Sequence, residues 1–135
     1  MSENRYDSTN PGPCVQKIKD LLRHIRPMVE RWPAFHKYTL GENIIQEILL
    51  MLRLSTKARL HFMNQSTLKE LYTSKEVLKA LVDEANGTIF TDKSGRERRL
   101  LTDHAYGVWA GMIDEIGKLI WGWMDSVKDR KSGSR

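Results

Sequence analysis

The histidines and the single cysteine are the first residues to test for metal chemistry. Helical bundles can hold two iron ions with Glu-x-x-His pairs, whose side chains project from one face of a helix. No glutamate in this chain has a histidine three residues later, and the four histidines show no other ligand spacing: His24, His36, His61 and His104. Cys14 is the only cysteine, which excludes an internal disulfide and a cysteine-based metal site. We predict no metal and no cofactor, and we interpret Cys14 as an inert residue at the surface or at a helix end.

Two arginine–histidine pairs carry the one enzymatic pattern in the sequence. Arg99 and His104 have four residues between them, as do Arg31 and His36, and this spacing resembles the Arg-x4–6-His motif of HEPN-type ribonucleases. The pattern arises easily in an arginine-rich chain, neither arginine is followed by the polar residue common in that family, and Pro33 interrupts the second pair. No glycine-rich phosphate loop or nucleophile motif is present. We predict that the chain is not an enzyme and keep the ribonuclease as a third alternative.

Positive charge is the stronger chemical signal. Lysine and arginine number 22 against 17 aspartate and glutamate residues, which gives a net charge of +5 and a pI near 9.4. Several of these cations recur at helical spacing, and such stripes contact phosphates without reading base sequence. The candidate nucleic-acid-binding residues are Lys17, Lys19, Arg23, Arg26, Arg53, Lys57, Lys75, Lys79, Arg96, Arg98 and Arg99.

Helices must position these side chains, because apolar residues recur at spacings of three and four along four segments. The predicted helices span residues 15–31, 40–62, 67–86 and 102–128. Three of the four tryptophans fall on the apolar stripes and are predicted core residues: Trp32, Trp109 and Trp123. This pattern is typical of an all-α, antiparallel up-down four-helix bundle. We expect the bundle to occupy residues 14–128, between a disordered lead at 1–13 and a flexible basic tail at 129–135.

Local signals set the expected ends of these helices. Thr39 and Glu42 match a capping box at the start of the second helix, and Ser66 or Thr67 is expected to cap the third. Asn86-Gly87 ends the third helix. Residues 88–99 are expected to form a loop, the alternative being a short strand near their start.

Some apolar and small residues lie outside the predicted buried stripes. Leu50 and Leu54 do so in the second helix, and Trp121 does so in the fourth. Three glycines also lie near one line on the outer side of the fourth helix, although each costs about 0.8–1 kcal/mol relative to alanine there. We interpret these residues as the contact between subunits of a homo-oligomer, since a monomer avoids exposing such a patch. The predicted interface comprises Leu50, Leu54, Gly107, Gly111, Trp121 and Gly122.

Apolar runs are short throughout the chain. The longest, Ile48–Leu52, is far below the roughly 20 residues that a membrane-spanning helix needs. The first ten residues are polar and lack the apolar stretch of a signal peptide. We therefore expect a cytoplasmic protein with no membrane partner.

Two segments resemble a known family. His36–Glu42, which follows Trp32-Pro33, and Asp114–Trp123 resemble the two signatures of the accessory variability determinant (Avd) family. That family lies within a wider group of small four-helix proteins that includes those encoded in ribosomal RNA intervening sequences. The resemblance covers about residues 15–128.

The resemblance implies a barrel-like homopentamer of four-helix bundles with a positively charged surface. It also implies two partners: the reverse transcriptase of a diversity-generating retroelement and its template RNA, with a DNA/RNA hybrid as a further ligand. The basic surface of the family carries over at Lys79, where Asp83 and Glu84 add negative charge nearby. The connection at 88–99 is also longer than the family leads us to expect. The function implied is a non-catalytic accessory subunit for mutagenic retrohoming, and the alternative is an orphan bundle that binds another RNA or protein.

Overall fold

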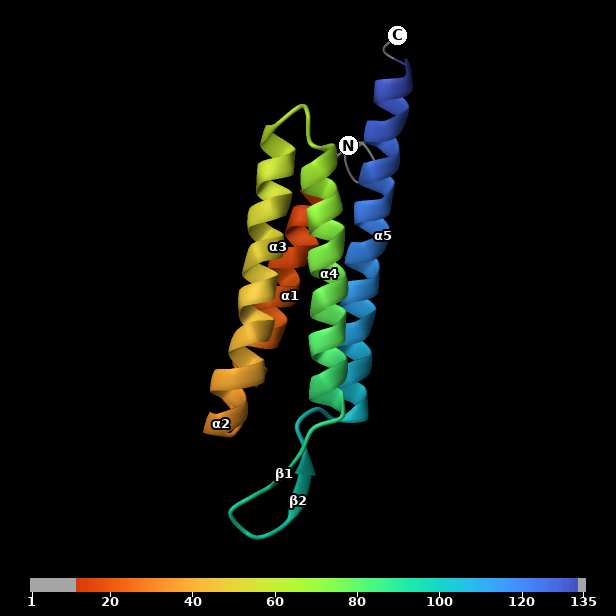
Figure 1. Cartoon of the computed structure of the whole chain (residues 1–135). Coiled ribbons are helices and arrows are strands. Elements are labelled where there is room, and N and C mark those ends of the chain that lie inside the picture. The colour runs from red at the N-terminus through yellow and green to blue at the C-terminus, as the bar shows by residue number, and fades with distance from the viewer. Residues whose placement is uncertain (1–11, 134–135) are drawn as a thin grey trace, which may run out of the picture.

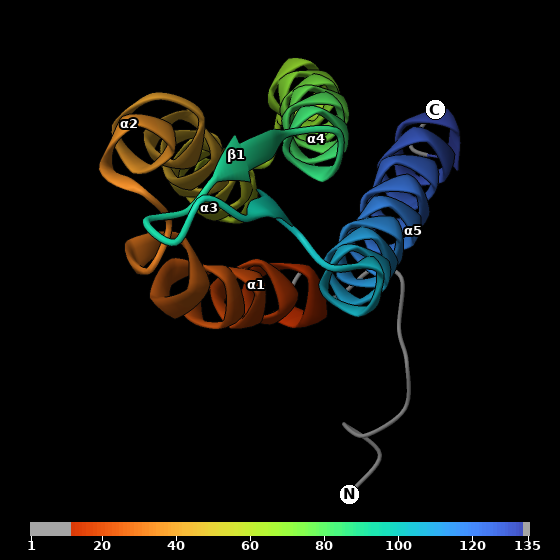
Figure 2. The same cartoon turned by 90° about the horizontal axis from the view of Figure 1, so that it is seen from below.

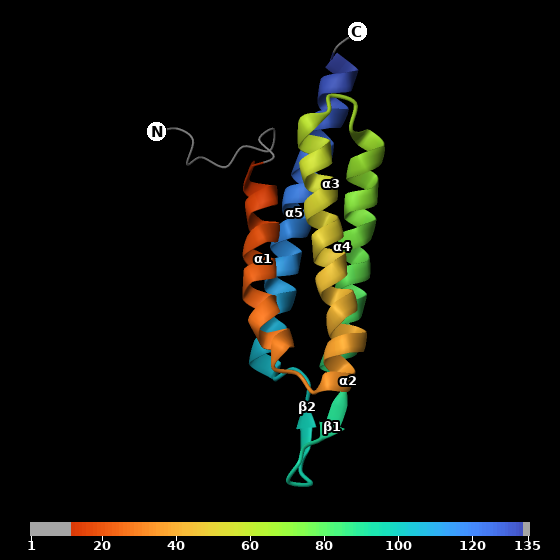
Figure 3. The ribbon, with the colours of Figure 1, turned by 90° about the vertical axis from the view of Figure 1, so that its left-hand side faces the viewer.

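Four long helices lie side by side and alternate in direction in the computed structural model, which describes residues 12–133 (Figures 1 and 3). They are α1 (Gly12–Glu30), α3 (Glu42–Leu60), α4 (Gln65–Asn86) and α5 (Asp103–Gly133). Helix α3 packs on α1 and α4, and α5 packs on the same two helices, so the order around the bundle is α1, α3, α4, α5. The predicted antiparallel bundle is confirmed, whereas its assembly into a ring stays a prediction.

Each helix buries one apolar stripe in a shared core. In α1 the stripe runs through Ile18, Leu21 and Ile25, none of which has any exposed surface. Each fully buried aliphatic side chain of this kind stabilises the fold by about 1.5–3 kcal/mol. The three predicted core tryptophans are also buried, and the rings of Trp32 and Trp109 stack with their centroids 6.0 Å apart.

Cys14 lies in the first turn of α1, as the helix-end alternative predicted, but it is buried in this core and not at the surface. Its side chain is 2% exposed. Burial raises the pKa of the Cys14 thiol to about 12, because a thiolate would lose its hydration there. The thiol therefore stays protonated at neutral pH, as expected of an inert cysteine.

The chain becomes helical again directly after Trp32-Pro33. Helix α2 (Ala34–His36) leads through a π-helical turn (Lys37–Gly41) into α3, so the helix begins well before the predicted start at Thr39. Thr39 lies within the π turn, and its hydroxyl donates a hydrogen bond of 2.7 Å to the carbonyl oxygen of Phe35. The predicted capping box of Thr39 and Glu42 was therefore wrong, because a threonine inside a helix can bond the preceding turn instead of capping a new one.

Gly41 explains how α3 can start so close to the end of α1. A Cβ atom at Gly41 would lie 2.7 Å from Cγ1 of Val29 and 3.3 Å from Cε3 of Trp32. The first distance is shorter than real carbon contacts, so glycine is what allows this close approach.

Helix α4 begins at Gln65, slightly before the predicted cap at Ser66 or Thr67, which was wrong. The buried Asn64 precedes it, and the Asn64 amide donates a hydrogen bond of 2.9 Å to the carbonyl oxygen of Ala58 near the end of α3. At the other end, the backbone N–H of Gly87 bonds the carbonyls of Asp83 and Glu84. The predicted stop at Asn86-Gly87 is confirmed.

Residues 88–99 form a β-hairpin, so the predicted loop was wrong. Strand β1 (Ile89–Thr91) pairs antiparallel with β2 (Glu97–Arg99), and Phe90 lies opposite Arg98. Gly95 closes the turn with a φ of +84°, a conformation that glycine adopts without strain. The alternative of a short strand near the start of this connection was correct. The strand that pairs with it, β2, is formed by the end of the same connection.

Helix α5 is the longest element, at 31 residues. It continues to Gly133, past the predicted end at Lys128, and extends beyond the α3–α4 connection (Figure 1). The start of the tail predicted to be flexible is thus helical. Of the lead predicted to be disordered, Gly12 and Pro13 belong to α1, and residues 1–11 lie outside the described residues. No helix between Gly12 and Gly133 is long and apolar enough to cross a membrane.

Candidate nucleic-acid interface

Three cations of α1 form an exposed row. Lys19, Arg23 and Arg26 are exposed, and none of them forms an ion pair with another described residue. Lys17 lies on the opposite flank, where its ammonium is 3.2 Å from a carboxylate oxygen of Glu115 in α5. That ion pair orients the helix, so the row of three lies on the flank that faces α3.

Two cations of the neighbouring helix α3 are also exposed. Arg53 and Lys57 are exposed and line a shallow hollow with Leu49, Leu52 and Thr56. Arg53 and Lys57 follow Leu50 and Leu54 by three residues each, so they lie on the outer side of α3, next to the flank that meets α4. Glu30 at the end of α1 and Glu42 at the start of α3 add negative charge near α2. The positive charge of these two helices is therefore concentrated toward the opposite end of the bundle. We call the following five residues the basic face: Lys19, Arg23, Arg26, Arg53 and Lys57.

The predicted cations of α4 lie elsewhere and are engaged within the subunit. The Lys75 side chain is 11% exposed and forms an ion pair with Glu76, and its ammonium is 4.3 Å from the ring centroid of Tyr72. Its Cε atom would be 3.1 Å from a Cβ at Gly117, so glycine makes room for the lysine stem. Lys75 therefore packs between α4 and α5 and points away from a phosphate ligand on the basic face.

Lys79 belongs to a polar cluster on the same side of the bundle. Its ammonium is 3.2 Å from Oδ1 of Asp83, and the hydroxyl of Tyr106 donates a hydrogen bond of 2.6 Å to the same oxygen. The hydrogen bond from Tyr106, with help from Lys79, lowers the pKa of the Asp83 carboxyl. The hydrogen bond to Asp83 raises the pKa of Lys79, so both groups are charged at neutral pH and balance each other.

Asp92 organises the cations of the hairpin. Its carboxylate accepts hydrogen bonds from the hydroxyl and backbone N–H of Ser94, from the backbone N–H of Arg96 and from Nε of Arg98. These bonds, led by that of the Ser94 hydroxyl, hold the pKa of Asp92 far below its usual range. The Arg96 side chain forms no ion pair within residues 12–128 and remains available to a ligand.

Arg99 fixes the base of the hairpin to the bundle. Its guanidinium donates to Oδ1 of Asp103 at 2.7 Å and to Oδ1 of Asn86 at 3.0 Å, so it joins the end of α4 to the start of α5. His104, its partner in the ribonuclease-like spacing, is exposed. Across the described part of the chain no three His, Cys, Asp or Glu side chains gather where they could hold a metal ion.

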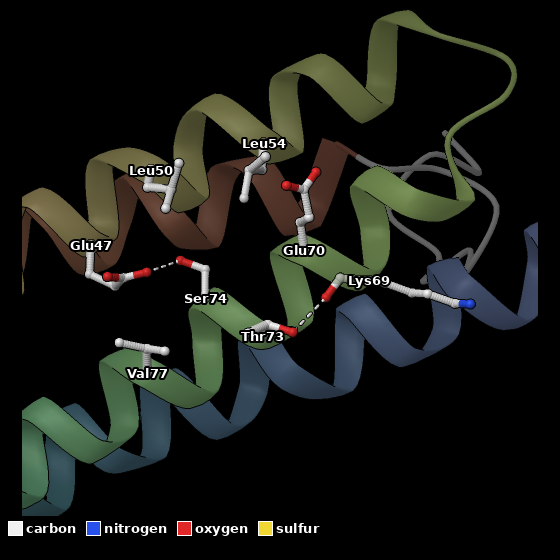
Figure 4. Close-up of a pocket in the computed structure, with 8 residues that line it drawn as sticks. All are labelled: Glu47, Leu50, Leu54, Lys69, Glu70, Thr73, Ser74 and Val77. Atoms are coloured by element: carbon white, nitrogen blue, oxygen red, sulfur yellow. Dashed lines mark hydrogen bonds between the residues drawn. The ribbon is translucent and has the colours of Figure 1, made fainter.

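An apolar groove lies between α3 and α4 (Figure 4). It encloses about 350 Å³ and is lined by Leu50, Leu54 and Val77, with Glu47 bonded to Ser74 across it. Leu50 is 41% exposed, as expected of an interface residue, and Val77 is 42% exposed. Leu54 is only 8% exposed, so its predicted position outside the core stripe was wrong.

The remaining candidates for a subunit contact lie on α5. Gly107 and Gly111 are exposed, and a Cβ atom at either would have no atom within 4 Å. Gly122 is partly buried. Trp121 is 54% exposed and packs edge-on against Tyr72 of α4, with the ring centroids 5.7 Å apart. Within one subunit, the glycines therefore leave open surface on α5, and Trp121 adds apolar surface turned toward α4.

Phe35 and Tyr38 are exposed aromatic residues that sequence reasoning missed. They are 74% and 64% exposed, beside Lys37 and His36. Both lie between the predicted helices at 15–31 and 40–62, because Pro33 and the capping motif at Thr39 suggest that the intervening residues are not helical. The signal that could have found them is their spacing of three, which puts both on one side of a helical turn.

Comparison with known proteins gives one match. A family model described as bAvd-like matches residues 14–127. This range contains His36–Glu42 and Asp114–Trp123, the two segments that resemble the Avd signatures. Searches of curated proteins and of solved structures found no match.

Proposed function

Because the chain belongs to the bAvd-like family, we propose that it is a non-catalytic accessory subunit of a diversity-generating retroelement. In this role it binds the reverse transcriptase and the template RNA in the cytoplasm and supports mutagenic retrohoming. A protein without chemistry of its own contributes by holding RNA and enzyme together, so it needs a surface for phosphates and a second surface for protein.

The basic face is the observation that carries the proposal. Its five cations are exposed and form no ion pair among residues 12–128, so they can neutralise phosphates without breaking contacts of the fold. Each phosphate contact releases counterions, and this makes affinity depend on salt. Four of the remaining predicted cations would first have to give up a carboxylate partner: Lys17, Lys75, Lys79 and Arg99.

The experiment is a salt titration of RNA binding. The variant Lys19→Gln/Arg23→Gln/Arg26→Gln should flatten the slope of log affinity against log salt by about 2, since each contact to a single strand contributes about 0.7. The matched control, Lys69→Gln/Lys118→Gln/Lys128→Gln, removes the same charge from α4 and α5 and should leave most of the slope. Equal slopes in both variants would contradict the basic face as the RNA site.

The protein partner is tested by co-purification. Co-expressed with the reverse transcriptase of a diversity-generating retroelement, the chain should elute in one complex with that enzyme. RNA binding that persists without such a complex would instead favour the alternative, a bundle protein with another partner.

Self-assembly completes the proposal. In the order α1, α3, α4, α5, the face between α3 and α4 lies opposite the face between α5 and α1. The groove with Leu50 and Val77 is on the first face, and the open glycines of α5 lie near the second. A head-to-tail contact between unlike faces closes into a ring when its rotation allows. We therefore propose a ring-like homo-oligomer, with the pentameric number taken from the family resemblance.

A further inference from the structure

The end of the bundle near α2 carries aromatic surface and positive charge together. Helix α2 and the π turn lie at the same end as the hairpin (Figures 1 and 2). The ring of His36 is 5.3 Å from that of Phe35 and 6.1 Å from that of Phe90 in β1, centroid to centroid. We call six residues the aromatic end: Phe35, His36, Lys37, Tyr38, Phe90 and Arg98.

The two most exposed rings of this end are held in place by backbone structure. Phe35 and Tyr38 are three residues apart, so they lie on one side of consecutive helical residues. The hydrogen bond from Thr39 to the Phe35 carbonyl ties the two turns together. The rings can therefore receive a flat ligand without the cost of ordering a loop.

Cations lie beside these rings. The Lys37 ammonium is 5.3 Å from the centroid of the Tyr38 ring. Arg98 lies opposite Phe90 in the hairpin register, so both side chains are on the face that His36 meets, whereas Glu97 is on the other face. Asp92 engages Nε of Arg98, and the terminal guanidinium nitrogens can still donate to a phosphate.

We propose that the aromatic end binds unpaired nucleobases of RNA by stacking on Phe35 and Tyr38, which rests on the RNA binding proposed above. Flat aromatic rings stack on bases of any sequence, and a neighbouring lysine or arginine holds the phosphates between them. Bases of a duplex are already stacked on each other and cannot reach such rings. The basic face then supplies affinity for any RNA backbone, and the aromatic end selects single-stranded segments.

The opposite end of the bundle provides a matched control. Phe62, in the connection between α3 and α4, is 76% exposed, close to the 74% of Phe35. Phe62→Ala therefore removes an equally exposed aromatic ring outside the proposed site.

The test compares three fluorescent oligonucleotides of equal length: a single-stranded RNA, the same strand with abasic sugars, and the duplex. Wild-type protein should bind the base-bearing strand at least about fivefold more tightly than the abasic strand, because each stacked base contributes at least that factor. Phe35→Ala/Tyr38→Ala should lose this preference and keep its affinity for the abasic strand. Phe62→Ala should keep both the preference for the base-bearing strand and the affinity for the abasic strand. Circular dichroism should be unchanged in all variants, since the altered side chains are exposed.

A second measurement reports stacking directly. A single-stranded RNA with one 2-aminopurine should lose fluorescence on binding to wild type and to Phe62→Ala, and should not do so on binding to Phe35→Ala/Tyr38→Ala. Equal binding of the base-bearing and abasic strands by wild type would overturn the inference while leaving the proposed RNA binding intact. An unchanged preference in the double variant would also overturn it. No binding to any of the three oligonucleotides would overturn the proposed function itself, and the inference with it.

Discussion

Gly41 lies where the start of α3 meets the end of α1, and an added Cβ there would be 2.7 Å from Val29. Gly41→Ala should therefore destabilise the fold by about 1–3 kcal/mol, the usual effect of forcing extra carbon into a packed site. The gain in helix propensity, about 1 kcal/mol, offsets only part of this. Urea unfolding followed by circular dichroism measures the change.

Gly87→Ala is the control for that measurement. A Cβ at Gly87 would lie 3.7 Å from its nearest neighbour, the carbonyl oxygen of Glu84, so this exposed site should change in stability by no more than about 0.5 kcal/mol. If Gly41→Ala proved as stable as Gly87→Ala, the contact between α3 and Val29 would not be the reason for glycine at position 41.

The burial of a single residue was predicted correctly where its position in an apolar stripe determines it. The prediction failed where contact with a residue of another helix determines burial. Trp109 falls on the apolar stripe of α5 and is fully buried. Lys75 looked like one of many surface cations, yet its stem lies over Gly117 of another helix. Nothing in the spacing of α4 reveals that a glycine forty-two positions later leaves room for this lysine. The helix-end position of Cys14 was predicted correctly, but its burial was not, because a residue at a helix end can still be covered by neighbouring helices.

The hairpin is the element whose stability depends most directly on one ionised group. The pKa of Asp92 is held below its usual 3.8 by hydrogen bonds from Ser94, Arg96 and Arg98. A depressed folded-state pKa gives stability that is fully present above about 3.8, and that is lost as pH falls through the lower folded value. The hairpin should therefore remain closed from pH 7 to 5 and loosen only in stronger acid.

The backbone amide signals of Ser94 and Arg96, followed by nuclear magnetic resonance from pH 6 to 2, report this change. In Asp92→Asn the new side-chain amide carries no charge and can accept fewer of these hydrogen bonds. The acid-dependent shift of the two backbone signals should therefore disappear, and the hairpin should be less stable at neutral pH. A shift of these amides centred above pH 4 in the wild type would contradict the assignment to Asp92.

Helices were easier to predict than their ends. Stripes at spacings of three and four recur over many residues, whereas a capping motif rests on two or three. The pair Thr39 and Glu42 matches a capping box, but a threonine can equally lie inside a π-helical turn. Only the acceptor of the Thr39 hydroxyl, which is the carbonyl oxygen of Phe35, distinguishes these two structures. The hairpin was missed because three-residue strands carry little periodicity, and its turn depends on Asp92.

Assembly is the prediction that concerns the whole molecule. The wild-type chain should have a mass in solution several times its 15.7 kDa. Gly111→Glu places a long charged side chain on open surface of α5, so it should leave the subunit folded and disrupt the oligomer. Light scattering coupled to size-exclusion chromatography measures the mass, and circular dichroism checks the fold.

Gln16→Glu is the control, since it also adds a negative charge at an exposed helical position, on α1. It should leave the mass unchanged. A wild-type mass of a single subunit, or an intact oligomer in Gly111→Glu, would contradict a contact through the glycines of α5.

The placement of the four tryptophans gives the protein its own optical probes. The stacked rings of Trp32 and Trp109 bring the end of α1 against α5, so their electronic coupling makes near-ultraviolet circular dichroism a direct readout of that packing. Trp121 is 54% exposed on α5, and its emission is open to quenching by acrylamide in water. A ligand or subunit that covers this part of α5 would shield Trp121 and leave the dichroism of the core pair unchanged. Unfolding would abolish the dichroism of the pair, so binding and loss of structure can be distinguished in one sample without an added label.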